Sequence, residues 1–260
     1  MRDDLIKDLL PSHGEAIDPQ ELARRDMRKK LPKRFYKEAR AKLVDGAYVL
    51  TLDGKPARTP AGQSLAVASK IVAEALAAEW DAQTEFIEPG SMPLTRIINS
   101  AVDGVAKEVE AVRAEIVKYA GSDLMCYRAD FPSNLVAEQA AAWDPVLGWV
   151  KSHLGARFVL AEGVMFVEQP AESIAAIADH VAQAEAPLRL AALHVMTTLM
   201  GSTLLALAVA HQHLSPKEAW DAAHLDEDFQ ARNWGMDADA MARRERRWVD
   251  MQAAALIALG

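Results

Sequence analysis

Residues 225–235 bring three carboxylates, two amides and two large aromatic rings into eleven positions. The candidate binding residues are Asp226, Glu227, Asp228, Phe229, Gln230 and Trp234. Adjacent carboxylates point in different directions around a helix, so they cannot by themselves form the facing acid pair that glycoside hydrolysis needs. The stretch contains no Ser, Cys or His that could act as a catalytic partner. This pattern favours a recognition surface over an active site.

The same stretch has the features of a short helix. Acidic residues in a first helical turn complement the positive end of the helix dipole. Gly235 follows at the position where a helix commonly ends in a conformation that glycine adopts at low cost. We therefore expect a helix that carries its acidic residues at its start and Trp234 near its end.

Motifs for other chemistry are missing from the chain. It contains no phosphate-binding glycine loop of standard type and no Gly-x-Ser-x-Gly nucleophile motif. His211 and His213 would point about 200° apart on a helix, which disfavours a shared metal. Cys126 lies in a short apolar run and is expected to be a buried, inert thiol. We expect no catalytic residue, no metal site and no cofactor.

The composition suits a protein of the reducing cytoplasm. The chain has 260 residues, is 51% hydrophobic and carries one cysteine, so no disulfide can form within it. Its first residues lack the apolar region of a signal peptide. Residues 190–210 are almost free of charge, but Arg189 precedes them and hydroxyl side chains interrupt them. We expect a single long buried helix there, with a transmembrane helix as the weaker alternative.

Charge is unevenly distributed along the chain. Residues 1–60 hold 14 basic against 10 acidic residues, and the remainder holds 15 against 27. A basic run begins at Arg24 and ends at Lys42, with Phe35 and Tyr36 as candidate stacking residues. Nucleic-acid binding through this run is one alternative function, and it requires a continuous positive face. A hydrolase is another, and it requires a pocket that gathers at least two titratable groups.

Hydrophobic periodicity divides the chain into two parts. Asp45-Gly46 and Asp53-Gly54 are tight-turn signals between short alternating runs, which predicts consecutive antiparallel strands. Helical spacing begins after residue 69 and dominates to the end. Helix starts are predicted at Asp144-Pro145, at Pro187, at the capping box of Ser215 and Glu218, and at Asp237.

These patterns predict an α+β protein. A loosely docked or mobile arm covers residues 1–30, a β-rich domain with one helix covers 31–90, and a larger all-helical domain covers 91–260. Trp80 and Trp143 continue apolar stripes and are expected to anchor the core, whereas Trp234 lies among polar residues.

Several short segments, in order and with matching spacing, resemble a family of assembly chaperones. These chaperones act on the catalytic sector of the F-type ATP synthase and hold its free α subunit; the family is that of mitochondrial F1 complex assembly factor 2. The matching segments are residues 33–36, 52–55, 59–60, 79–83, 92–94, 143–145 and 225–237.

The resemblance implies a protein that is not an enzyme, and because the sequence shows no mitochondrial presequence we expect a bacterial member. It would act without ATP hydrolysis, remain a monomer when free, not insert stably into membranes, and bind the unassembled α subunit without nucleic acid. The acidic helical region is implicated in the family's function, which maps onto Asp226, Glu227 and Asp228 with the neighbouring Phe229, Gln230 and Trp234. Trp80, Gln83, Trp143 and Gly235 are assigned to the structure.

Overall fold

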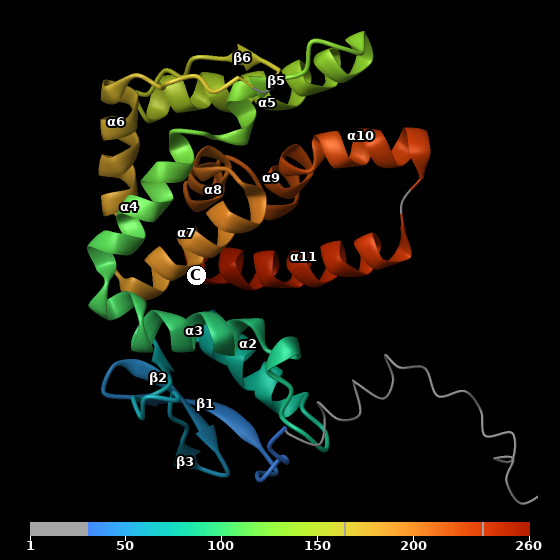
Figure 1. Ribbon diagram of the computed structural model, residues 1–260. Helices are drawn as coiled ribbons and strands as arrows, with labels where there is room; N and C mark the ends of the chain where they lie inside the picture. Colours follow the sequence, from blue (N-terminus) through green and yellow to red (C-terminus); the bar gives the residue numbers. More distant parts are fainter. Residues whose placement is uncertain (1–30, 164, 236) are drawn as a thin grey trace, which may run out of the picture.

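A computed structural model describes residues 31–163, 165–235 and 237–260. The α+β class is confirmed: short antiparallel strands near the start are followed by a mostly helical remainder (Figure 1). The predicted arm and the first part of the basic run lie outside the described residues. The buried apolar residues on both sides of residue 90 form one continuous cluster. The division into domains at that position stays a prediction.

The sheet is built around its second strand. β1 (Ala39–Val44) pairs antiparallel with β2 (Ala47–Leu52), and β3 (Lys55–Pro56) and β4 (Ala66–Val67) both pair with β2. Asp45 and Gly46 both have positive φ, +49° and +84°. Both central residues of a type I′ turn need positive φ, and the twist of that turn matches the strands it joins. The predicted hairpins are therefore confirmed.

Helices make up most of the chain after the sheet. Their bounds are α2 (Lys70–Asp81), α3 (Pro93–Asp103), α4 (Val109–Ala120), α5 (Ser133–His153), α6 (Ala171–Ala182), α7 (Pro187–Met200), α8 (Thr203–Ala210), α9 (Pro216–Ala223), α10 (Leu225–Trp234) and α11 (Ala238–Leu259). Short 3₁₀ turns lie at Pro89–Ser91, Val105–Lys107 and Leu124–Cys126. A small parallel pair joins β5 (Tyr127–Arg128) to β6 (Ala161–Glu162).

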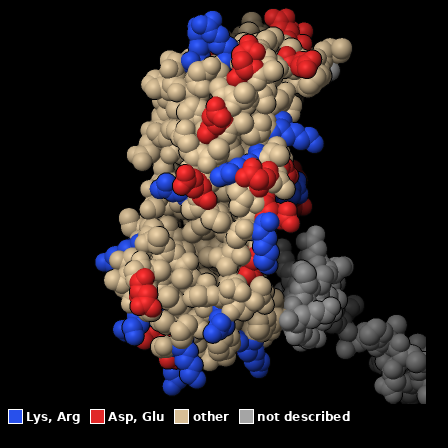
Figure 2. Space-filling view, turned by 90° about the vertical axis from the view of Figure 1, so that its left-hand side faces the viewer, with Lys and Arg blue, Asp and Glu red and all other residues tan. Residues whose placement is uncertain are grey.

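Figure 1 shows the sheet with α2 and α3 at one end and α5 with β5 and β6 at the other. α7 lies between these ends and packs against α3, α4, α8 and α11. α10 and α11 form a hairpin that projects to one side. From the side of α4 and α6, the surface is hollowed near its middle and carries scattered charges of both signs (Figure 2).

A carboxylate on α2 caps the start of α3. The Glu79 carboxylate accepts hydrogen bonds from the N–H groups of Leu94 and Thr95, both at 2.8 Å, and from the Thr95 hydroxyl at 2.6 Å. Trp80 Nε1 donates to the same hydroxyl at 2.9 Å. Met92, the N-cap residue of α3, contributes no side-chain cap. Glu79 therefore satisfies first-turn donors that α3 cannot satisfy itself.

Replacing Glu79 with alanine is expected to lower the free energy of unfolding by about 2 kcal/mol, because partly buried α3 donors lose their acceptor. Urea unfolding followed by circular dichroism measures the change. Glu74→Ala on the same helix is the control, since Glu74 makes only an exposed pair with Lys70 at 3.5 Å. Equal effects of the two substitutions would contradict the capping role.

The predicted long apolar helix is wrong in one respect, because residues 190–210 form two helices. α7 ends at Gly201, whose φ of +66° is left-handed, and the Ser202 side chain then caps α8 by accepting from Leu205 N–H. Both helices are largely buried, as expected of core helices. Among the described residues, no helix is both long and apolar enough to cross a membrane.

The helix start predicted at Asp144-Pro145 is also wrong. α5 begins at Ser133 and continues through Pro145. A proline inside a helix frees the carbonyl four residues earlier, here that of Ala141. Ala141 and Pro145 both lie on the exposed side of α5. The freed carbonyl therefore faces solvent, and burial of the opposite side keeps the helix continuous.

Candidate functional site

The acidic stretch forms α10, as predicted. Asp226, Glu227 and Asp228 occupy its first turn, and Gly235 ends it with a φ of +84°. The preceding α9 begins with the predicted capping box of Ser215 and Glu218. At the junction of the two helices the buried His224 ring packs on Trp220, with 3.9 Å between ring centroids. α10 is thus held firmly at its start.

The three carboxylates of α10 have different surroundings. Asp226 accepts a hydrogen bond from Gln139 Nε2 on α5 at 2.8 Å. Asp228 makes a two-pronged ion pair with Arg244 on α11, and this hydrogen-bonded guanidinium lowers the Asp228 pKa. Glu227 is exposed and has no hydrogen bond or ion pair of its side chain within the described parts of the chain. Glu227 is therefore the carboxylate available to a partner.

The remaining candidates also separate by exposure. Phe229 is buried at 5% exposure, so its ring packs beneath α10. Gln230 is exposed, and Trp234 is 79% exposed. Glu227, Gln230 and Trp234 are three and four positions apart, which places them along one face of the helix. That face borders a cavity of about 470 Å³ between α10 and α11.

The residues assigned to the structure lie in or near the core. Trp143 is 1% exposed and donates from Nε1 to the Ala222 carbonyl at 2.8 Å, which ties α5 to the end of α9. Trp80 is half-buried. Gln83 is buried, and its carbonyl oxygen accepts from Glu88 N–H at 2.8 Å, which fixes the chain that leads to α3.

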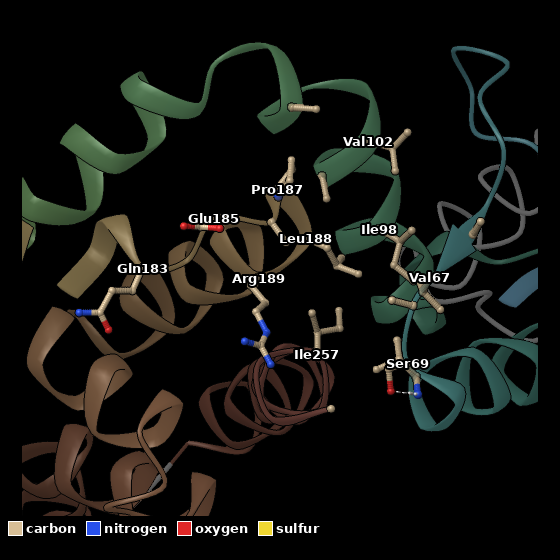
Figure 3. A pocket seen from close by; sticks show the side chains of 17 residues that line it. Val67, Ser69, Ile98, Val102, Gln183, Glu185, Pro187, Leu188, Arg189 and Ile257 are labelled. Carbon is tan, nitrogen blue, oxygen red and sulfur yellow. Dashed lines mark hydrogen bonds between the residues drawn. The ribbon is translucent and has the colours of Figure 1, made fainter. Parts of the chain in front are cut away.

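A larger cavity, of about 870 Å³, lies where the β-rich part meets the helices. Its lining is mainly apolar, with Val67, Ile98, Leu188 and Ile257 on its walls (Figure 3). Figure 3 places the polar side chains of Gln183 and Glu185 on the segment that joins α6 to α7, and that of Arg189 in the first turn of α7. The lining side chains include only one carboxylate and one guanidinium, without a nucleophile positioned by a base.

His211 and His213 lie at the C-terminal end of α8. α8 ends at Ala210, so His211 and His213 lie beyond the helix, and both rings contact Trp149 with centroids 5.9 and 4.7 Å away. No group of three or more potential metal-ligating residues occurs in the described ranges. Cys126 is buried, and burial raises the pKa of its thiol to about 12.

The described end of the basic run forms internal contacts. Arg34 donates to the carbonyls of Lys37 and Asp81 and pairs with the Asp81 carboxylate at 3.1 Å. Arg40 pairs with Glu38. These two cations are therefore partly neutralised where a polyanion would have to bind.

Comparisons with known proteins agree with the fold and motifs. A family model described as ATP12 chaperone protein matches residues 33–151. The mitochondrial atp12 protein of Schizosaccharomyces pombe is 21% identical over 220 residues, covering 80% of this chain and 75% of that protein.

Solved structures match over most of their length. The Atu1473 protein from Agrobacterium tumefaciens is 48% identical with a TM-score of 0.84, covering 94% of this chain and 91% of that one. Atp12 from Paracoccus denitrificans is 37% identical with a TM-score of 0.80, covering 87% of this chain and 97% of that one. A variant of the Paracoccus protein, with one aspartate changed to lysine, has a TM-score of 0.79. The chain belongs to the ATP12 chaperone family.

Proposed function

We propose that this protein is an ATP-independent assembly chaperone that binds the unassembled α subunit of the F-type ATP synthase catalytic sector in the cytoplasm. It covers the surface that the α subunit later buries against β subunits and so promotes assembly. Family membership and the match over nearly the whole Paracoccus Atp12 chain support this proposal. An unassembled subunit exposes apolar surface that invites aggregation, which gives such a chaperone its task.

The observation that carries the choice of binding surface is the exposed face of α10. Among the described residues the Glu227 side chain makes no hydrogen bond or ion pair that binding would have to break, and Trp234 exposes most of its ring. Interfaces use such aromatic rings for apolar contact and use charges for orientation and rate of encounter. In this proposal Asp226, Asp228 and Phe229 position the helix, while Glu227, Gln230 and Trp234 contact the α subunit.

Two other functions lack comparable support. Hydrolysis would need an acid, a base or a nucleophile brought together in a pocket, and the apolar lining of the larger cavity favours no such arrangement. Nucleic-acid binding would need free cations along one face, whereas Arg34 and Arg40 are paired. No specific feature of the described residues favours either function over the chaperone.

The proposal predicts that the wild-type protein co-purifies with isolated α subunit and suppresses its aggregation. Glu227→Lys should weaken binding about 10-fold, because a basic group on the α subunit then meets a like charge. Affinity is measured by titrating labelled α subunit. Glu245→Lys, the same charge change at an exposed position on α11, is the control. Failure of the wild type to bind would remove the main proposal. Normal binding by Glu227→Lys would remove only the assigned surface.

A further inference from the structure

The hairpin of α10 and α11 presents two facing stripes with the same helical spacing. On α10, the residues that border the cavity are Glu227, Gln230, Ala231 and Trp234. Positions separated by three, four and seven residues lie along one side of a helix. This side of α10 therefore faces α11 across the cavity over about two turns.

The opposing stripe on α11 repeats the spacing with basic residues. Ala240, Arg243, Arg244 and Arg247 border the same cavity. Two packed helices normally bury apolar residues at such positions, because an apolar seam removes surface from water. Here only alanines and Trp234 supply apolar surface, and the remaining positions are charged or amide side chains.

Specific contacts hold the two helices in this arrangement. The Asp228–Arg244 ion pair connects them, and the positive φ of Gly235 ends α10 before the chain turns back into α11. Arg247 donates to the Leu199 carbonyl at the end of α7, which fixes that part of α11 to the core. The cavity of about 470 Å³ thus lies between helices that are each anchored elsewhere.

The two walls of the cavity have opposite charge. Glu227 on α10 has no hydrogen bond or ion pair, and Arg243 on α11 likewise has none within the parts of the chain that the structure describes. Ala231 and Ala240 are small and leave room between the walls, and the exposed Trp234 ring lies at the end of the α10 stripe. A ligand that fits must therefore be apolar in the middle, basic on one side and acidic on the other.

We propose that this groove binds one amphipathic α-helix of the unassembled α subunit. The client helix packs an apolar side chain between Ala231, Ala240 and Trp234, directs a basic side chain to Glu227 and directs an acidic one to Arg243. Helices recognise grooves of this kind through residues at the same three- and four-residue spacing. The proposal rests on the proposed function and adds Arg243 on α11 as a contact residue.

A polyanion or a free phosphate fits the groove less well. Glu227 and Asp237 both border the cavity, and their carboxylates repel an anion that approaches the arginines. A client with charges of both signs meets attraction on each wall. Charge complementarity therefore selects a protein segment as the occupant.

The test compares charge reversal inside and outside the groove. Arg243→Glu should weaken binding of isolated α subunit at least about 10-fold, and Arg246→Glu should leave it within about twofold. Both positions are exposed on α11, and only Arg243 borders the cavity. Ala240→Trp, which fills the groove, should weaken binding similarly, whereas Ala242→Trp on the exposed side of α11 should not.

The outcomes separate the two proposals. If the wild type fails to bind the α subunit, the proposed function fails. If the wild type binds, and either Arg243→Glu or Ala240→Trp binds within about twofold of it, the groove proposal is overturned and the proposed function stands. Thermal unfolding of each variant shows that a loss of binding is not a loss of fold. Weakening by both groove variants, with both controls unaffected, supports the groove as the client site.

Discussion

Replacing Trp143 with alanine is expected to lower the free energy of unfolding by about 3–5 kcal/mol. The indole is 1% exposed, so its removal leaves a large cavity within the cluster of buried apolar residues. It also removes the hydrogen bond from Nε1 to the Ala222 carbonyl at the end of α9. An acceptor left without a donor in the interior adds to the cost.

Chemical unfolding in urea, followed by circular dichroism, measures this change. Trp234→Ala is the matched control, because Trp234 is 79% exposed and its removal should change stability by less than about 0.5 kcal/mol. The two substitutions should have the reverse order of effects on binding to the α subunit when each protein is assayed folded. A small loss of stability for Trp143→Ala would contradict the assignment of this residue to the core.

Local signals predicted the β-rich part well. The Asp-Gly dipeptides specify turns by their backbone conformation, so the hairpin between β1 and β2 could be identified from a few neighbouring residues. The capping box at Ser215 and Glu218 likewise depends on atoms within one helical turn. Features of this kind need no knowledge of the rest of the fold.

Features that depend on distant residues were not predictable in the same way. α5 continues through Pro145 because this residue lies on the exposed side of the helix. Which side of α5 is exposed depends on how its opposite side packs against the rest of the protein. The sequence placed six candidate binding residues on one short helix, yet the contacts of Asp226 with Gln139 and of Asp228 with Arg244 span 87 and 16 positions. The arginines at positions 243–247 could have indicated the α11 wall of the groove, because they are visible in the sequence. That this wall faces α10 follows only from the way the chain turns back after Gly235.

Asp123 is the clearest example of a feature that could not be predicted from its neighbours in the sequence. In the sequence it is an ordinary polar residue after Gly121 and Ser122, but its side chain is completely buried. The carboxylate accepts from the Ser202 hydroxyl at 2.9 Å and from the Leu204 N–H at 3.1 Å, and so joins the turn after α4 to the break between α7 and α8. The glycine–serine break that divides the apolar helix thus provides donors for a buried acid.

This burial predicts an unusual pH dependence of stability. Desolvation raises the pKa of Asp123 from its usual 3.8 to about 6, although its hydrogen bonds act in the opposite direction. Because the folded state binds the proton more tightly than the unfolded state, Asp123 is most favourable to folding below pH 3.8. The favourable contribution is lost as the pH rises through about 6 and amounts to about 3 kcal/mol.

Comparison with Asp123→Asn isolates this effect, because asparagine keeps the size of the side chain and does not titrate. The free energy of unfolding of the wild type minus that of the variant should fall by about 2.4 kcal/mol between pH 4 and pH 7, and remain constant above pH 7. The difference cancels the titration of carboxylates elsewhere in the chain, and the neighbouring Cys126 thiol, with a pKa of about 12, does not titrate in this range. A difference that rises with pH would mean that hydrogen bonds to the Asp123 carboxylate outweigh its desolvation.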